Sequence, residues 1–145
     1  MKKKFIFLLV FILLALVLNF AWENLQFPLY NSVLSFKSIF GFSFNSLFSI
    51  ALYASLIDAF WITAVYLLIA IIDKNIRWEL NKVNLILFSI TLILIAMIME
   101  RFGLSSGRWS YSSLVPIIFG IGLSPLIQLA VTGLIGLLVS RKLSV

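Results

Sequence analysis

Four long apolar runs constrain the fold of this chain more than any other feature of its sequence. They cover about residues 5–26, 47–72, 83–102 and 114–139. An α-helix needs about 20 mainly apolar residues to cross the hydrocarbon core of a bilayer, and each run reaches that length. Only helices and closed barrels satisfy their backbone groups in lipid. The sequence therefore predicts an all-α, four-transmembrane-helix bundle that forms a single integral membrane domain over residues 1–145.

The composition supports a membrane protein and removes several kinds of chemistry. Hydrophobic residues make up 63% of the chain and charged residues 11%, whereas soluble domains average about 45–50% and about 25%. The chain contains no Cys and no His. Disulfides, thiolate catalysis and the commonest general base are therefore excluded. A metal site would depend on carboxylates alone, and we predict neither a metal nor a cofactor.

The distribution of the 11 cations indicates how the chain crosses the membrane. Eight cations lie at the two termini and in the connector between the second and third runs, and three lie in the other connections. The first set is Lys2, Lys3, Lys4, Lys74, Arg77, Lys82, Arg141 and Lys142, and the second is Lys37, Arg101 and Arg108. The positive-inside rule then puts both termini in the cytoplasm, with the helices in the cell (cytoplasmic or inner) membrane. The cations form no long basic face, so no binding of nucleic acid is expected.

The connections between the runs are predicted from their length and polarity. Residues 28–44 are expected to form an interfacial loop or a short helix on the membrane surface. Residues 73–82 form a polar connector. Residues 102–113 form a loop on the outer side, in which Gly103 and Gly107 are expected to stop the third helix and to turn the chain.

A few polar residues interrupt the apolar runs, and their spacing places them on helix faces. Asn19, Glu23 and Gln26 are four and three residues apart, so they share one face of the first helix. Pro28 is expected to end or kink that helix. Asp58 lies near the middle of the second run, where a carboxylate facing lipid costs about 2.5–3.5 kcal/mol. It is expected to face protein or water, with a structural and a functional role equally open.

The fourth run carries a polar face of its own, because Ser124, Gln128 and Thr132 recur every four residues. Together with the alternation of the spans, this face predicts a polar pocket that opens toward the outer leaflet. Glu23 and Glu100 would lie near the outer interface, and Asp58 and Gln128 deeper, as the floor. Such pockets between bundle helices commonly hold ligands.

The predicted pocket suits a lipid-like molecule. Glu23, Glu100 and Asp58 are the expected acid/base groups, and Arg108 would bind the phosphate or carboxylate of a headgroup. The other expected ligand-binding residues are Trp22, Gln26, Trp109, Tyr111 and Gln128. Two simpler interpretations stay open: Glu100 and Arg108 form a structural ion pair, and the aromatic residues belong to an interfacial aromatic belt.

A resemblance covers nearly the whole chain. It is carried by Trp22-Glu23-x-x-Gln26-x-Pro28-Leu29-Tyr30, by Asp58, by Glu100…Gly107-Arg108-Trp109-x-Tyr111…Pro116, and by Gly122-Leu-Ser-Pro125-Leu-x-Gln128. This pattern resembles a family of small four-span bacterial membrane proteins of unassigned function. It is more faintly similar to integral-membrane carotenoid cyclases and hydratases, in which a carboxylate precedes a Gly-x-Trp-x-Tyr-like segment. Those proteins have more spans and further acidic motifs. That similarity implies acid chemistry on an isoprenoid.

Three classes of function remain open from the sequence. The first is a protein that binds or acts on a lipid or isoprenoid, and whether it is an enzyme is left undecided. The second is a non-catalytic accessory subunit, whose polar residues lock helices together or bind a span of a partner membrane protein. The third is a small transporter protomer. No internal repeat is evident in the sequence, so a transporter would need a homodimer to supply the symmetry.

Overall fold

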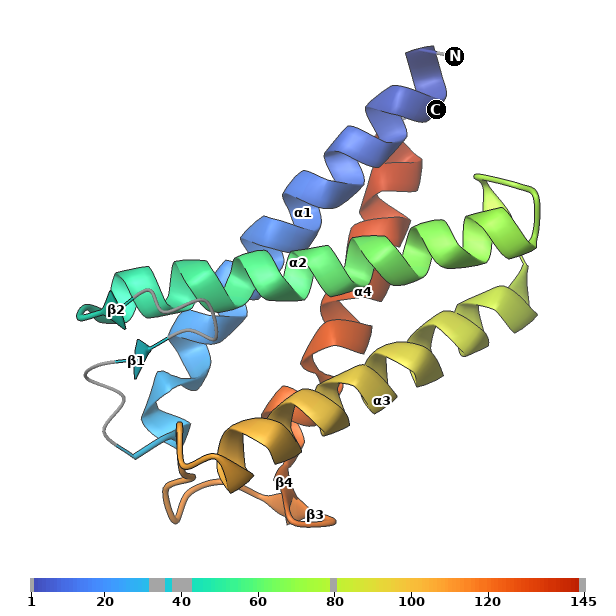
Figure 1. Cartoon of the computed structure of the whole chain (residues 1–145). Coiled ribbons are helices and arrows are strands. Elements are labelled where there is room, and N and C mark those ends of the chain that lie inside the picture. Colours follow the sequence, from blue (N-terminus) through green and yellow to red (C-terminus); the bar gives the residue numbers. More distant parts are fainter. Residues whose placement is uncertain (1, 32–35, 38–42, 79–80, 144–145) are drawn as a thin grey trace.

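A computed structural model of the chain describes residues 2–31, 36–37, 43–78 and 81–143. Four helices in these residues are long and apolar enough to cross a membrane. The elements are α1 (Lys2–Gln26), the 3-10 helix η1 (Phe27–Leu29), β1 (Phe36–Lys37), β2 (Ser43–Phe44), α2 (Leu47–Ile72), α3 (Lys82–Ser105), β3 (Ile117–Ile118), β4 (Ile121–Gly122) and α4 (Leu123–Leu143) (Figure 1). The prediction of a helical bundle with four apolar helices is confirmed.

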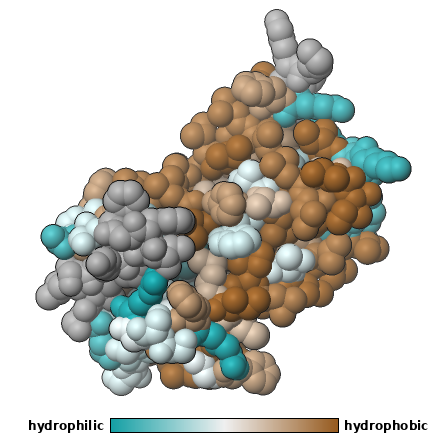
Figure 2. All heavy atoms as spheres, in the orientation of Figure 1, coloured by the Kyte–Doolittle hydropathy of each residue, from teal (hydrophilic) through white to brown (hydrophobic). Residues whose placement is uncertain are grey.

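Large apolar side chains point outward along the helices. Val17 is 61% exposed, Phe60 61%, Ile98 68% and Leu138 56%. Hydrophobic residues cover most of the face in Figure 2, and hydrophilic residues gather toward its two ends. A soluble monomer rarely exposes an apolar patch of more than a few hundred Å². Such a surface is compatible with a multi-pass membrane protein.

Local sequence signals fix where α2 and α3 begin. The Ser46 side chain accepts a hydrogen bond from the Ser49 backbone N–H at 3.2 Å. The Asn81 side chain accepts one from the Val83 N–H at 3.0 Å. Both caps satisfy donors that the first turn of a helix leaves free. α1 ends at Gln26, and Pro28 lies in the 3-10 helix η1 that follows it. The prediction that Pro28 ends the first helix is therefore confirmed.

The four helices do not pack uniformly. α1 lies against α2 and α4, and α4 also lies against α3. α2 and α3 meet near the connector between them, where the Trp78 ring packs against Tyr66 at 5.1 Å and against Phe88 at 5.4 Å. From there the two helices diverge toward β2 and the end of α3 (Figure 1). This divergence leaves a wedge that side chains of all four helices surround.

The connector between α2 and α3 lies at the same end of the bundle as the start of α1. The Arg77 guanidinium stands over the Phe7 ring, 5.0 Å from its centre. Figure 1 shows the N and C ends of the chain close together at this end. The start of α2 and the end of α3 lie at the opposite end, as alternating spans require.

The fourth helix begins later than predicted. The expected span started at residue 114, but residues 117–122 form a β3–β4 hairpin and α4 starts at Leu123. Phe119 and Gly120 make the turn with φ of 54° and 77°. Pro125 lies in the first turn of α4, where its missing N–H has no helical partner to lose. The apolar character of residues 114–122 hid this boundary.

The connections also differ from their predictions. α3 continues through Gly103 to Ser105, and the turn falls at Gly107, where φ is 66°. Gly103 therefore does not stop the helix. In residues 28–44, which were expected to form a loop or a short surface helix, β1 pairs antiparallel with β2, so these two segments are not helical. Residues 32–35 and 38–42 lie outside the described residues, and the prediction is not tested there.

Candidate functional site

A cavity of about 430 Å³ occupies the wedge between α2 and α3. Its volume is in the range of small-molecule sites, about 300–1,000 Å³. Most of its wall is apolar. The polar and charged side chains that line it are Glu23, Gln26, Tyr30, Tyr53, Asp58, Trp61, Glu100, Arg108, Trp109 and Gln128.

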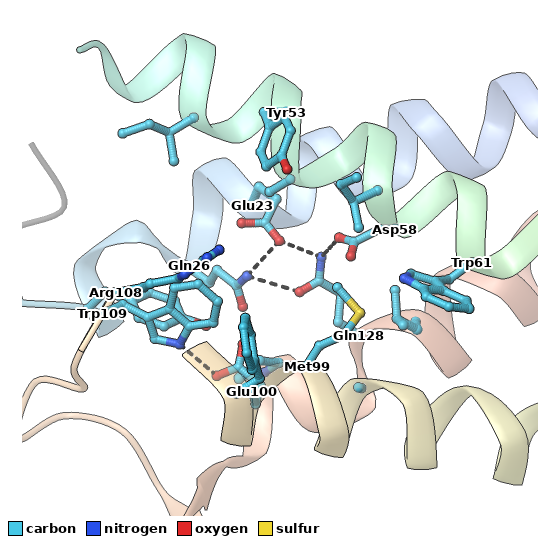
Figure 3. A pocket seen from close by; sticks show the side chains of 18 of the residues that line it. Glu23, Gln26, Tyr53, Asp58, Trp61, Met99, Glu100, Arg108, Trp109 and Gln128 are labelled. Atoms are coloured by element: carbon cyan, nitrogen blue, oxygen red, sulfur yellow. Dashed lines mark hydrogen bonds between the residues drawn. The ribbon is translucent and has the colours of Figure 1, made fainter. Parts of the chain in front are cut away.

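Gln128 lies at the centre of the polar part of this cavity (Figure 3). Its Nε2 donates to Glu23 Oε1 and to Asp58 Oδ2, each at 2.8 Å, and approaches Asn19 Oδ1 at 3.2 Å. Its Oε1 accepts from Gln26 Nε2 at 2.9 Å. One amide from α4 thus contacts polar groups of α1 and α2. Helices that share buried hydrogen bonds are held in a fixed relative position.

The polar face of α1 forms as its spacing predicted. Asn19 and Gln26 are buried, and Glu23 lies between them on the same side of the helix. Gln26 Nε2 donates to Glu23 Oε1 at 2.9 Å as well as to the α4 amide. Neighbours four and three residues apart lie on one side of a helix. Because these groups would be costly against lipid, the face turns toward α4 and α2.

The polar face of α4 also forms as predicted and completes this network. Thr132 Oγ1 lies 2.8 Å from the Gln128 carbonyl oxygen and 3.2 Å from Asn19 Oδ1. Ser124 Oγ donates to Gln26 Oε1 at 3.1 Å. The same Ser124 oxygen accepts from Trp22 Nε1 at 3.1 Å. Every polar residue of the two predicted stripes therefore has a partner on the facing helix.

Glu100 has a separate set of donors. Its Oε2 accepts from Trp109 Nε1 at 3.1 Å and from Tyr111 Oη at 2.5 Å. These two donors hold the Glu100 carboxylate in one position. The aromatic-belt interpretation expected Trp109 and Tyr111 to donate at the membrane interface. Both donate to the Glu100 carboxylate instead.

The loop after α3 is held in place by close packing and by hydrogen bonds to the end of α1. A Cβ on Gly103 would come within 1.9 Å of the Trp109 ring, so the loop can fold back only over a glycine. The Ser112 N–H donates to the Leu29 carbonyl at 2.9 Å, and the Asn31 N–H donates to the Ser110 carbonyl at 2.9 Å. These contacts hold the loop in a position from which Trp109 lines the cavity.

Two tyrosines lie beside Glu100. The Tyr30 and Tyr111 rings are 5.5 Å apart, and Tyr30 lines the cavity. Burial first, and then the charge of Glu100, raise the pKa of the Tyr30 phenol. Burial, followed by the hydrogen bond to Glu100, raises the pKa of the Tyr111 phenol. Both phenols therefore stay protonated well above neutral pH and remain donors.

Seven of the predicted site residues line the cavity. They are Glu23, Gln26, Asp58, Glu100, Arg108, Trp109 and Gln128. The other two, Trp22 and Tyr111, do not line the cavity. Trp22 donates a hydrogen bond to Ser124, and Tyr111 donates one to Glu100. Glu23 was expected near the rim, apart from Asp58. It lies instead beside Asp58, because both carboxylates reach the same amide.

Sequence reasoning missed the aromatic and small residues of α2 that line the cavity. Tyr53, Ala54, Ile57 and Trp61 all do so, together with Asp58. A signal existed for Tyr53, Ala54 and Trp61, because they lie three to five residues from Asp58 and therefore near it on the helix surface. The expectation that Asp58 faces the bundle could have been extended to these neighbours.

Arg108 lies on the loop that follows α3 and lines the cavity. Its guanidinium stands over the Phe102 ring, 5.1 Å from the ring centre. In the described residues, no group of three carboxylate, His or Cys side chains is arranged to hold a metal ion. The cavity therefore offers protons, hydrogen bonds, one guanidinium and apolar contacts to a ligand.

No family model, curated protein or solved structure matches this chain. What the site can do chemically follows from its own groups. It has a carboxylate pair around one neutral amide, a third carboxylate with two donors, and an apolar wall. Groups of this kind bind polar ends of amphiphilic molecules, and they can give and take protons.

Proposed function

We propose that this chain is a multi-pass protein of a bacterial cell membrane that binds a lipid-like or isoprenoid molecule in the wedge and transfers a proton to it. The observation that carries the proposal is the contact of Glu23 and Asp58 with the single amide of Gln128. Both carboxylates line a cavity whose walls are mostly apolar. The opening between two lipid-facing helices supplies a route for a molecule that is dissolved in the bilayer.

The carboxylate pair holds one proton in this proposal. An amide nitrogen carries two hydrogens, and Gln128 Nε2 is approached by oxygens of Asn19, Glu23 and Asp58. A neutral amide compensates little charge. Two ionised carboxylates so close together in an apolar site would repel each other strongly. A shared proton removes one charge, and the pair then titrates as a unit.

A shared proton makes the pair a general acid. For an isoprenoid double bond, the carboxyl O–H bond breaks, a C–H bond forms, and the neighbouring carbon becomes positive. Return of a different proton from that intermediate to the carboxylate pair gives an isomer and restores the acid. Glu100 accepts hydrogen bonds from Trp109 and Tyr111, so its surroundings differ from those of the pair. Two carboxylates in unlike environments are the usual basis for separate acid and base roles.

The same proposal puts both termini in the cytoplasm and the cavity in the outer half of the membrane. Its support is the excess of cations at the ends of the chain and in the 73–82 connector. The chain has no Cys, so Ser106→Cys introduces a single thiol in the loop after α3. A membrane-impermeant maleimide should label it in intact cells. Labelling only after permeabilisation would reverse the topology.

The ligand can be tested by mass spectrometry of lipids that copurify with the protein. The unchanged protein should enrich one lipid or isoprenoid class, and cells that express it should accumulate an altered form of that class. Glu23→Gln and Asp58→Asn should retain the bound molecule and lose the altered form. Asp73→Asn, an exposed carboxylate at the end of α2, is the matched control and should change neither. An absence of any enriched lipid would contradict the proposal.

A non-catalytic accessory subunit is the second candidate, and the same network favours it for a different reason. The Gln128 amide joins α1, α2 and α4, which is what a purely structural lock requires. In that case a partner membrane protein or a second copy should copurify in place of a lipid. Glu23→Gln and Asp58→Asn would then reduce assembly and leave the lipid profile of the cell unchanged.

A further inference from the structure

The cavity concentrates the negative charge of the chain. Three of the five acidic residues, Glu23, Asp58 and Glu100, line it. They come from α1, α2 and α3, and the polar lining residue from α4 is the neutral Gln128. The one Lys or Arg that lines the cavity in the described residues is Arg108. The cavity therefore holds three acidic side chains and one basic one among the described residues.

Aromatic rings form much of the remaining wall. Tyr30, Tyr53, Phe60, Trp61 and Trp109 all line the cavity. Figure 3 shows Trp61 and Trp109 on opposite sides of the carboxylates, with Tyr53 above them. The face of an aromatic ring carries partial negative charge and attracts cations, most strongly when water is excluded. Rings and carboxylates therefore favour the same sign of ligand charge.

Arg108 is one basic group beside three acidic ones. Its guanidinium also stands over the Phe102 ring, 5.1 Å from the ring centre. The Gln128 amide holds the Glu23 and Asp58 carboxylates in position. An apolar molecule in the cavity therefore meets more acidic side chains than basic ones.

We propose that this cavity selects an apolar molecule that carries a positive charge, with the charge placed among Glu23, Asp58 and Glu100 and the body against the aromatic wall. The inference rests on the proposed function and names the charge of its ligand or intermediate. In the proton-transfer reaction that charge is the carbocation formed from the double bond. A stable organic cation would take the same place and release the proton shared by the carboxylate pair.

Two probes of nearly equal shape and opposite charge test this inference on the unchanged protein. Tetraphenylphosphonium is a cation and tetraphenylborate is an anion, and each has four phenyl rings around one central atom. Titration calorimetry in a zwitterionic detergent gives the dissociation constant of each. The cation should bind at least about tenfold more tightly than the anion. Repeating the titration in buffers of different ionisation enthalpy should show proton release with the cation.

Variants then assign the selectivity to the cavity. Asp58→Asn and Glu100→Gln should each weaken binding of the cation by about tenfold and leave binding of the anion unchanged or stronger. Asp73→Asn is the control and should bind both probes as the unchanged protein does. Gel filtration and circular dichroism identify a variant that fails to fold, and the two-probe comparison does not depend on any variant.

The outcomes separate this inference from the proposed function. Equal binding of the two probes, tighter binding of the anion, or no binding of the cation by a protein that still copurifies a lipid would overturn the charge preference and leave lipid binding intact. Selective binding of the cation without any copurified lipid would support the charge preference and contradict the proposed lipid function.

Discussion

Gln128→Leu is the substitution that most directly tests the arrangement around the cavity. Leucine has a similar volume, so the change removes the amide with little loss of packing. Asp58 and Asn19 remain buried, and Glu23 still lines the cavity without this donor. Leaving buried polar groups unsatisfied costs more than replacing both partners by apolar groups. The variant should therefore be strongly destabilised.

The expected magnitude follows from the number of hydrogens on the amide. Nε2 can make two full hydrogen bonds, and its two shortest contacts go to Glu23 and Asp58. Hydrogen bonds to charged groups contribute about 1.5–3 kcal/mol each, whereas those between membrane helices average about 0.6 and reach about 1.7 kcal/mol. Two bonds at about 1.5 kcal/mol each predict a loss of about 3 kcal/mol in the free energy of unfolding.

Reversible unfolding in mixed micelles, with increasing sodium dodecyl sulfate and far-UV circular dichroism, measures this loss. Leu138→Ala provides a control on the same helix, because the Leu138 side chain is 56% exposed and points away from the bundle core. It should change the free energy of unfolding by less than about 1 kcal/mol. If Gln128→Leu were as stable as the unchanged protein, the amide would not be the link between α1, α2 and α4, and the reasoning would be refuted.

Two further predictions concern the loop after α3. Tyr111→Phe should lower the free energy of unfolding by about 1.5–3 kcal/mol, because it removes a hydrogen bond to the Glu100 carboxylate. The raised pKa of Tyr111 in the folded protein means that its contribution is complete below about pH 10 and is lost as pH rises further, so the unchanged protein should lose stability there faster than Tyr111→Phe does. Gly103→Ala should cost about 1–3 kcal/mol and displace Trp109, since the new methyl group would overlap its ring. Unaltered stability and tryptophan fluorescence in Gly103→Ala would contradict this packing.

The parts of the fold that follow from short-range regularities could be predicted from the sequence. The four apolar runs specify helices because lipid leaves the backbone no other partner. The polar faces of α1 and α4 follow from the helical period, which fixes which side chains share a side. The beginning of α4 could not be read in the same way. Residues 114–122 are as apolar as the helix itself, and a hairpin and a helix start look alike in hydropathy.

The candidate site was predictable in its residues but not in their grouping. Asp58 and Gln128 stood out because polar groups are costly in lipid and must face protein or water. Nothing in the sequence paired Glu23 with Asp58 through Gln128. This pairing joins three helices that are far apart along the chain. It depends on how far each helix is rotated and shifted against its neighbours, and spacing within one helix does not contain that information. Glu100 lies near Trp109 and Tyr111 along the chain, but the fold of the loop between them decides that both side chains donate to it.

The sequence by itself thus determined that this is a chain of apolar helices with a small set of polar groups that must be turned inward. Only the tertiary structure decided that α2 and α3 diverge. The Tyr66, Trp78 and Phe88 rings pack at one end of this helix pair, and a cavity of about 430 Å³ is left toward the other end. The physical reason is that lipid solvates every apolar face equally well. Close packing of particular side chains, and the partners available to Gln128, must therefore set how the helices cross.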